Sequence, residues 1–186
     1  MEYFKTIRLK GGGACVLRNG TEKDSAALLK IFSLTHGQTD FLMSYPDEIS
    51  MTQEQETAYL KAKTESVDEI EIIAEIDGRL VGSAGIERVG SKEKVKHRAH
   101  FGISIDRAYW GLGIGRGLTE ACIECAKKAG YAQLELKAVA ENTRALALYR
   151  RAGFVEYGRN PRGFRSRQTG WQELVLMRLE LEEARP

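Results

Sequence analysis

Hydrophobic and polar residues alternate along several stretches of the chain, a pattern typical of β-strands that bury one face. The two clearest stretches, residues 69–76 and 79–89, are joined by the pair Asp77-Gly78. An Asp-Gly pair in this setting favours a tight hairpin, because both residues of its turn take positive φ. Further strands are expected at residues 14–17, 99–106, 134–139, 154–157 and 172–179.

Apolar residues recur three and four positions apart in other stretches, a spacing typical of helices with one buried face. Thr21 and Thr52 precede the first two of these stretches, and threonine is a good N-terminal cap. A third helix is expected to end before Gly130, and a fourth to span residues 142–152. The buried face of the third helix is expected to comprise Leu118, Ala121, Cys122, Cys125, Ala126 and Ala129.

The predicted elements follow in the order strand, two helices, three strands, helix, strand, helix and two strands. Consecutive strands favour antiparallel pairing, whereas strand–helix–strand connections favour parallel pairing. The order therefore predicts an α/β (α+β) fold, in which helices cover a mixed sheet. The length of 186 residues, without repeats or linkers, predicts a single domain over residues 1–186. Residues 1–13 are expected to form either a flexible leader or an extra N-terminal strand.

Composition excludes several classes of protein. Apolar residues make up 42% and charged residues 29% of the chain, as in soluble globular proteins, and the net charge is +2. Neither nucleic acid nor a membrane is therefore an expected partner, because the net charge is small and no apolar run reaches the ~20 residues of a membrane span. Without an apolar signal segment at the N-terminus, a cytoplasmic protein is expected.

The three cysteines, Cys15, Cys122 and Cys125, are too few for a disulfide framework. The Cys122-x-x-Cys125 pair lies on the apolar face of a predicted helix and has no second ligand pair, so no metal site is expected. His97 and His100 point to opposite faces of an extended segment, which also argues against a metal site.

Charge is distributed unevenly along the chain. Residues 45–75 hold nine acids and two bases, a net charge of −7. Two interpretations stay open: the segment attracts a cationic ligand, or it forms solvated helix faces that happen to be acidic.

A glycine-rich segment between a predicted strand and a predicted helix is the most informative part of the sequence. Glycines there allow the backbone to approach a ligand closely, and the N–H groups of a helix N-terminus suit phosphate. The dinucleotide pattern G-x-G-x-x-G fails at Arg116 and Leu118, and the Gly-Lys-Ser/Thr of a P-loop is absent. The segment reads Tyr109-Trp110-Gly111-Leu112-Gly113-Ile114-Gly115-Arg116-Gly117-Leu118.

This segment resembles the Gln/Arg-x-x-Gly-x-Gly/Ala motif of the GCN5-related N-acetyltransferase (GNAT) superfamily, with Trp110 in place of the Gln or Arg. A second motif is similar too: Asn142, then Tyr149 seven residues later, then Gly153-Phe154. The resemblance covers residues 70–180. It implies a mixed, mostly antiparallel central sheet of six to seven strands flanked by about four helices.

The resemblance also implies a reaction, in which an amine directly attacks the thioester of acetyl-CoA. Tyr149 would protonate the departing thiolate, and backbone N–H groups of the splayed strand near residues 103–105 would polarise the carbonyl. No metal takes part. The residues expected to bind acetyl-CoA are Ile103, Ser104, Ile105, Leu112, Gly113, Ile114, Gly115, Arg116, Gly117, Asn142, Ala145 and Tyr149.

The general base is less well defined. Members of the family often carry a glutamate near the position of Ala99 or His100. His100, whose ordinary pKa of about 6.5 suits the role, and Glu87 on the preceding strand are equal candidates. Ser104 is a candidate for orienting a water molecule.

The acceptor is expected between the first strand, the first two helices and the loop over residues 41–50. The acidity of this region favours a small cationic molecule with a primary amine, and a protein N-terminus or a lysine is the alternative. A protein of another class, a non-catalytic acyl-CoA-binding sensor, would also explain the missing glutamate, but not Tyr149. Whether the protein forms a homodimer is left open by the sequence. Four arginines before the last strand either reach an anionic group or lie in a solvated loop: Arg159, Arg162, Arg165 and Arg167.

Overall fold

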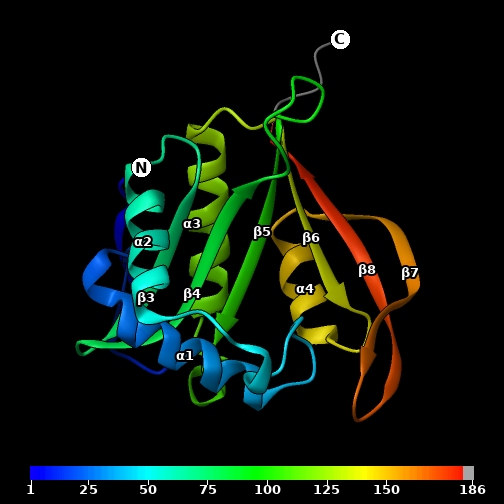
Figure 1. Cartoon of the computed structure of the whole chain (residues 1–186), viewed down its shortest axis with the longest axis horizontal. Coiled ribbons are helices and arrows are strands. Elements are labelled where there is room, and N and C mark those ends of the chain that lie inside the picture. The colour runs from blue at the N-terminus through cyan, green and yellow to red at the C-terminus, as the bar shows by residue number, and fades with distance from the viewer. Residues whose placement is uncertain (182–186) are drawn as a thin grey trace.

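A twisted sheet of eight strands, in the order β1-β2-β3-β4-β5-β6-β8-β7, runs through the molecule (Figure 1). The computed structural model describes residues 1–181, so residues 182–186 of the predicted domain lie outside it. The strands are β1 (Phe4–Arg8), β2 (Ala14–Asn19), β3 (Ile70–Ile76), β4 (Arg79–Arg88), β5 (Arg98–Ile105), β6 (Gln133–Val139), β7 (Val155–Ser166) and β8 (Gly170–Glu180). The α-helices are α1 (Ser25–Gln38), α2 (Gln53–Glu65), α3 (Ile114–Lys128) and α4 (Thr143–Arg151).

The predicted fold class is confirmed: β5 and β6 pair in parallel, and all other neighbouring strands of the described sheet pair antiparallel. The predicted count of six to seven strands was too low. The additional strand is β1, which pairs with β2 and corresponds to the extra N-terminal strand that was one of the two expectations for residues 1–13. It is a mostly exposed edge strand with the sequence FKTIR, so its alternation of apolar and polar residues is weak.

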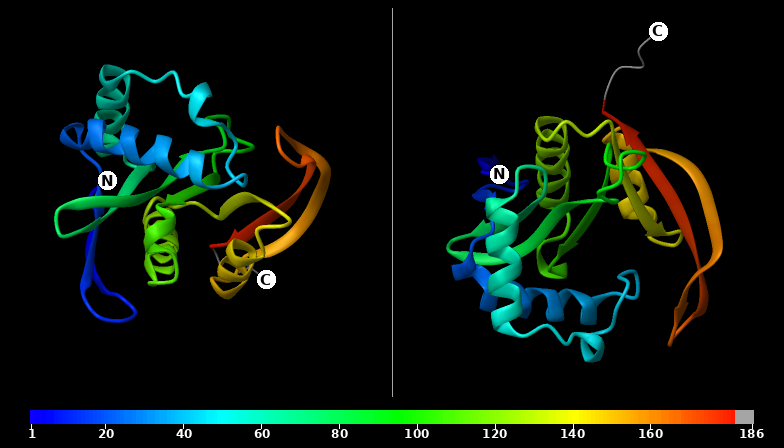
Figure 2. Two further views of the ribbon diagram at one scale, coloured as in Figure 1. Left: turned by 90° about the horizontal axis from the view of Figure 1, so that it is seen from below. Right: turned by 45° about the horizontal axis from the view of Figure 1, so that its top comes forward.

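The two faces of the sheet are covered by different helices (Figure 2). On one face Ile72 of β3 belongs to a large core that includes Leu118 of α3. On the other face the next residue, Ile73, is buried with Leu60 of α2 and Leu28 of α1. Successive side chains of β3 therefore point alternately toward α3 and toward the α1–α2 pair.

Strands β5 and β6 diverge, and this divergence positions the site. They pair only where residues 98–100 face residues 133–135, after which β6 pairs with β8 alone. Residues 101–105 therefore have a strand partner, β4, on one side only. Figure 1 shows the gap widening toward the carboxyl end of β5, beside α4.

The hairpin of β7 and β8 is longer than predicted. A strand was expected at residues 154–157, but β7 continues to Ser166. Two register shifts interrupt its pairing with β8, between Glu156 and Gly158 and between Asn160 and Phe164, and they break the alternation that would reveal a strand.

Candidate functional site

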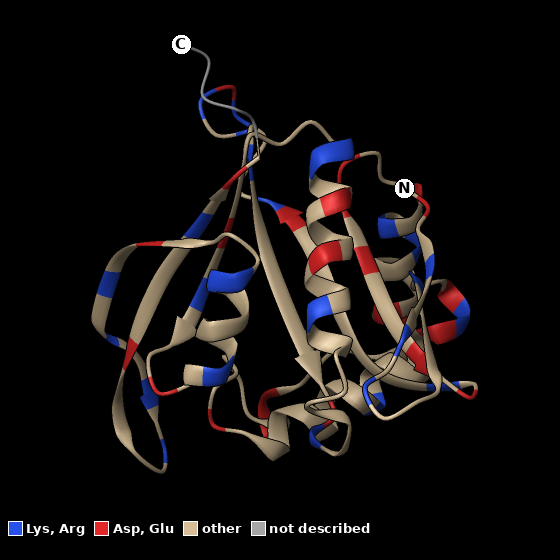
Figure 3. Cartoon of the chain, turned by 180° about the vertical axis from the view of Figure 1, so that it is seen from behind, with Lys and Arg blue, Asp and Glu red and all other residues tan. Residues whose placement is uncertain are grey.

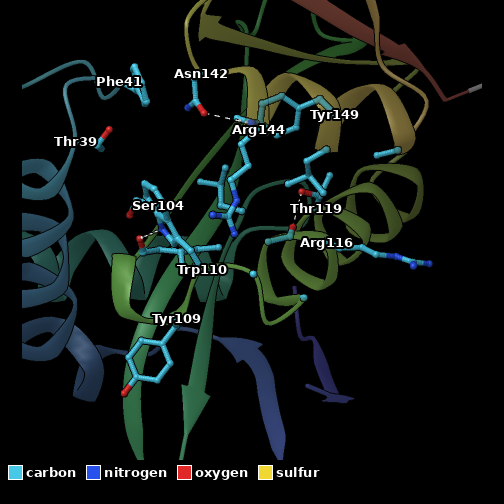
Figure 4. A pocket seen from close by; sticks show the side chains of 18 of the residues that line it. Thr39, Phe41, Ser104, Tyr109, Trp110, Arg116, Thr119, Asn142, Arg144 and Tyr149 are labelled. Atoms are coloured by element: carbon cyan, nitrogen blue, oxygen red, sulfur yellow. Dashed lines mark hydrogen bonds between the residues drawn. The ribbon is translucent and has the colours of Figure 1, made fainter. Parts of the chain in front are cut away.

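A cavity of about 560 Å³ opens where β5 and β6 diverge. Its walls come from the β1–β2 turn, the end of α1 and the loop that follows, the last residues of β5, the glycine-rich turn, the first turns of α3, and α4 along its length (Figure 4). The residues expected to bind acetyl-CoA that line it are Ile103, Ser104, Ile105, Gly113, Gly115, Arg116, Asn142, Ala145 and Tyr149.

The glycine-rich turn leaves the N-terminus of α3 open. Gly113 is the N-terminal cap residue, with φ +101°, and has no side chain to bond the free N–H groups of the first turn. The N-terminus of α4 differs, because Asn142 Oδ1 accepts a hydrogen bond from the N–H of Ala145 at 3.2 Å. The start of α3 thus keeps its N–H groups available for an anion.

Three residues of the predicted binding segment, Leu112, Ile114 and Gly117, do not line the cavity. Ile114 is buried in the core. A Cβ at Gly117 would stand 2.6 Å from Ile7 Cδ1, so this glycine allows α3 to lie against β1. The carbonyl of Leu112 accepts a hydrogen bond from the N–H of Lys10, which ties the β1–β2 turn to the glycine-rich turn.

Basic side chains surround the cavity. Lys10, Arg116, Arg144 and Arg151 line it, together with one acid, Glu120, which pairs with Arg116 at 2.7 Å. Helix α4 supplies two of these arginines, and all of its charged residues are basic (Figure 3). An excess of positive charge next to an open helix N-terminus suits a ligand with phosphate groups.

Of these four cations, only Arg116 is among the residues expected from the sequence to bind acetyl-CoA. Lys10, Arg144 and Arg151 belong to elements far away along the chain, and no local pattern marks them. The nearest available signal is the closeness of Arg144 to Asn142 at the start of the same helix.

Trp110, which stands where the family motif has Gln or Arg, contacts both strand β5 and the guanidinium of Arg144. Its indole N–H donates to the carbonyl of Ile105 at 2.8 Å. The guanidinium of Arg144 lies over its ring, 5.3 Å from the ring centroid, and close to Gly111. Trp110 therefore holds a neighbouring cation at the glycine-rich turn.

Tyr149 lies between the core and the cavity. Its side chain is 7% exposed and lines the cavity, and its ring packs edge-on against Phe101 and Phe154. Burial raises the pKa of the Tyr149 hydroxyl, so this group stays protonated at neutral pH. A protonated hydroxyl at this position can donate a proton or a hydrogen bond into the cavity.

The two candidate bases, Glu87 and His100, do not line the cavity. They face each other across β4 and β5, and His100 lies four residues, about 13 Å, along the strand from Ser104. Glu87 also pairs with Lys63 at 3.0 Å and accepts a hydrogen bond from the Tyr59 hydroxyl at 3.1 Å. Among the described residues that line the cavity there is no histidine.

The wall opposite the glycine-rich turn is built by Thr35, Thr39, Phe41 and Leu42. The loop that carries the last two is fixed to the β7–β8 hairpin by Asp40. The Asp40 carboxylate accepts hydrogen bonds from Ser166 Oγ at 2.6 Å, Thr169 Oγ1 at 3.2 Å and Gln172 Nε2 at 3.2 Å.

The four arginines of the β7–β8 region do not line the cavity. Arg167 pairs with Asp47 at 2.8 Å, and Arg159 pairs with Glu156 and Glu173. Arg162 and Arg165 lie over the exposed ring of Trp171. These arginines are therefore engaged with neighbouring side chains on the surface of the hairpin.

Within residues 1–181, no group of three or more His, Cys, Asp or Glu side chains is placed to hold a metal ion. None of the described helices is long and apolar enough to cross a bilayer. The three cysteines are free and buried, Cys122 and Cys125 within the apolar face of α3.

Residues 35–154 match the model of the acetyltransferase (GNAT) family, and the chain belongs to that family. It is 41% identical over 88 residues to the N-alpha-acetyltransferase RimI of Mycobacterium tuberculosis, which covers 47% of this chain and 53% of the relative. It is 27% identical over 130 residues to the mycothiol acetyltransferase of Jonesia denitrificans, covering 69% of this chain and 40% of the relative. The chain thus spans about half or less of the length of these curated relatives.

Among solved structures, the GNAT-family acetyltransferase of Streptococcus pneumoniae superposes with a TM-score of 0.85 at 28% identity, covering 90% of this chain and 99% of the other. The YncA acetyltransferase of Salmonella typhimurium, solved with acetyl-CoA, shares the fold with a TM-score of 0.79 at 19% identity, covering 97% and 98%. The predicted family is confirmed.

Proposed function

We propose that this protein transfers an acetyl group from acetyl-CoA to a primary amine. The observation that carries the proposal is the cavity between β5 and β6. It has an open helix N-terminus and basic side chains in its wall, together with a protonated tyrosine hydroxyl. Acetyl-CoA has matching parts: several phosphates, an amide-rich arm and a thioester.

The phosphates would bind the free N–H groups at the start of α3, with Arg116 and Arg144 beside them. The amide-rich arm would lie along residues 103–105, whose edge facing β6 has no strand partner in the described sheet. Backbone N–H groups on this edge would donate to the arm and to the thioester carbonyl. Donation to the carbonyl stabilises the negative charge that develops on its oxygen during attack.

Tyr149 would act as the general acid. When the amine nitrogen has bonded to the carbonyl carbon, the bond from carbon to sulfur breaks and the sulfur leaves with the electron pair. The raised pKa of Tyr149 keeps a proton on its hydroxyl for transfer to this sulfur. Proton donation at this position also argues against a non-catalytic acyl-CoA-binding sensor.

The acceptor we propose is a small cationic molecule with a primary amine. Support comes from the acidic residues of α2 and β3, on the same side of the sheet as the wall formed by Thr35, Thr39 and Phe41. Electrostatic attraction would raise the local concentration of such an amine.

A protein N-terminus is the second candidate acceptor, favoured by a specific comparison. The chain is 35% identical over 81 residues to an Escherichia coli enzyme described as a ribosomal protein bS18 alanine N-acetyltransferase, covering 44% of this chain and 54% of the relative. The mycothiol acetyltransferase, in contrast, is named for a small-molecule substrate.

Both candidates are tested by one incubation series. The protein and acetyl-CoA are mixed with spermidine, lysine, an aminoglycoside, or a short peptide with an N-terminal alanine. Release of free coenzyme A and a product heavier by one acetyl group identify the acceptor. A protein that binds acetyl-CoA but acetylates none of these amines would support the sensor alternative instead.

A further inference from the structure

The proposed reaction needs a group that takes a proton from the amine, and the cavity wall does not supply one directly. Among the described lining residues the only carboxylate is Glu120, which pairs with Arg116 on the first turns of α3. An ammonium group cannot attack a thioester until it has lost a proton. The accepting group must therefore lie behind the wall and be connected to it.

Three polar residues share the sheet face toward α1 and α2. Glu71 lies two residues before Ile73, which is buried with Leu60 of α2, so both side chains point to that face. Ser83 of β4 is directly opposite Ile73 on one side and Ser104 of β5 on the other. Residues paired in this way point to the same face of the sheet. Ser104 lines the cavity (Figure 4).

The carboxylate of Glu71 reaches across β4 toward β5. A Cβ at Gly85, the residue opposite Glu71, would stand 2.3 Å from Glu71 Oε2, so the carboxylate covers that glycine. Gly102 follows in the same row on β5, and a Cβ there would meet no heavy atom of the described chain within 4 Å. Two glycines in one row thus keep the sheet face free of side chains between Glu71 and β5.

The serines connect this carboxylate to the cavity. Ser83 is buried, 6% exposed, and its hydroxyl lowers the pKa of the neighbouring Glu71 carboxyl. Directly opposite residues on antiparallel strands have Cβ atoms about 4.5–5.5 Å apart, so the hydroxyls of Ser83 and Ser104 lie within reach of each other directly or through one water.

We propose that Glu71 is the terminal proton acceptor of a relay that runs from the amine through Ser104 and Ser83. This inference rests on the proposed acetyl transfer and names the residues that deprotonate the amine. Glu71 of β3 would then be the general base, the role expected for Glu87 or His100.

Three proton transfers deprotonate the amine. The ammonium group gives a proton to the Ser104 oxygen, Ser104 passes its own proton to Ser83, and Ser83 passes its proton to the Glu71 carboxylate. The neutral nitrogen then bonds to the thioester carbon, and the bond from carbon to sulfur breaks. Tyr149 protonates the sulfur and regains a proton from the nitrogen. The amide and free coenzyme A leave, and Glu71 releases one proton to solvent.

The electrostatic surroundings suit Glu71 to this task. Burial raises the pKa of Glu71 to about 7, and the carboxylates of Glu56 on α2 and Glu87 on β4 raise it further. The ammonium of Lys63 on α2 and the Ser83 hydrogen bond oppose this rise. A base whose pKa lies near the working pH accepts and releases protons most efficiently.

Three other titratable groups surround this site. The Tyr59 hydroxyl of α2 donates to Glu87. Arg18 of β2 points to the same face but pairs with Asp24 and Glu75. Cys122 of α3 lies on the opposite face and stays a thiol, because burial raises its pKa. Lys63 is therefore the positive charge that lowers the pKa of Glu71 from α2.

The test is the pH dependence of kcat/KM, with spermidine and a peptide with an N-terminal alanine as probes. The wild-type rate is expected to rise with pH through a midpoint near the pKa of Glu71, about 7. Glu71→Gln should lower kcat at least tenfold and remove that midpoint, because general bases contribute about 10²–10⁴-fold. Ser83→Ala should also lower kcat, whereas Glu71→Asp should recover part of the rate and the midpoint.

Glu56→Gln is the matched control, since it removes a neighbouring buried carboxylate that has no place in the relay. It should keep the wild-type kcat and a single midpoint, shifted to lower pH, because the Glu56 carboxylate helps to raise the pKa of Glu71. Calorimetry with acetyl-CoA establishes that each variant is folded. A folded Glu71→Gln with the wild-type midpoint and rate overturns the relay, as does an equal loss in Glu56→Gln. If the wild type acetylates neither spermidine nor the alanine peptide, the proposed function itself is overturned, and the relay with it.

Discussion

The ring of Tyr149 on α4 meets the ring of Phe101 on β5 edge to face, with centroids 6.0 Å apart and ring planes inclined by 86°. A second edge-on contact, to Phe154, also has a centroid distance of 6.0 Å. These contacts hold the Tyr149 ring, so its hydroxyl has one direction relative to the end of β5. The packing of the ring and the proposed proton donation by the hydroxyl can therefore be tested separately.

Tyr149→Phe separates them. The ring contacts remain, so the free energy of unfolding should change by less than about 1 kcal/mol. Without the hydroxyl, kcat should fall by about 10-fold to 10³-fold, while the KM for acetyl-CoA changes little, because the donor is needed only as the thiolate departs. Single-turnover kinetics measure the chemical step. An unchanged rate of that step would assign the hydroxyl no role as an acid.

Gly113 allows a test of the phosphate site. Gly113→Ala forces a side chain into the left-handed region at φ +101°, next to the open N-terminus of α3. Affinity for acetyl-CoA, measured by calorimetry, should fall at least tenfold, about 1.4 kcal/mol. Gly130→Ala is the matched control, because Gly130 has φ +79° at the other end of α3 and carries the same backbone strain. Equal affinities in the two variants would contradict the site.

Arg144 should contribute to acetyl-CoA binding through its charge. Arg144→Ala removes a cation that lines the cavity and stacks on Trp110, so the affinity should fall about 5-fold to 20-fold and become less sensitive to salt. Arg150→Ala, on the same helix but outside the cavity lining, should keep the wild-type affinity. A loss of similar size in Arg150→Ala would mean that the general charge of α4, rather than Arg144, attracts the phosphates.

Asp40 should affect the acceptor and not the donor. Asp40→Ala breaks the hydrogen bonds to Ser166, Thr169 and Gln172 that fix the loop bearing Phe41 and Leu42. The KM for the acceptor should rise severalfold, with the affinity for acetyl-CoA unchanged. Asp47→Ala breaks only a fully exposed pair with Arg167, which water screens, and should have little effect. Equal effects in the two variants would contradict a specific role for Asp40.

Glu71 should also make stability depend on pH. Its pKa lies near 7 in the folded protein and at the ordinary value of 4.5 in the unfolded chain. Between these two pH values the folded state holds a proton on Glu71 that the unfolded chain has already lost. The stabilisation of the folded state that results is complete below pH 4.5 and is lost as the pH rises through about 7. Chemical unfolding measures the free energy of unfolding at pH 5 and at pH 8. From pH 5 to pH 8 this free energy should fall by on the order of 1–3 kcal/mol more in the wild type than in Glu71→Gln. Parallel changes in the two proteins would contradict the raised pKa.

The sequence predicts most of the fold because the strands of the meander have one clearly apolar face and local turn signals. The hairpin at Asp77-Gly78 and the helix that follows Gly113 are both determined by neighbouring residues, and both are present in the structure. Strand β1 is predicted only as one of two alternatives for residues 1–13, since an exposed edge strand needs few apolar residues.

The site is predicted only in part, for a related reason. The glycine-rich turn and Tyr149 belong to local motifs, whereas Lys10, Arg144 and Asp40 meet the site through contacts between distant segments. Glu71 shows the same limit. Alternation indicates the sheet face on which it lies, but does not reveal that α2 packs over that face.

Mass spectrometry of the amine series, after incubation with the protein and acetyl-CoA, tests whether an acetyl group passes from acetyl-CoA to a primary amine. At least one cationic amine or alanine peptide is expected to gain one acetyl group, with one coenzyme A released for each acetyl group transferred. Tyr149→Phe is expected to slow this gain. Tight binding of acetyl-CoA without acetylation of any amine would mean that the protein is not an N-acetyltransferase for these amines.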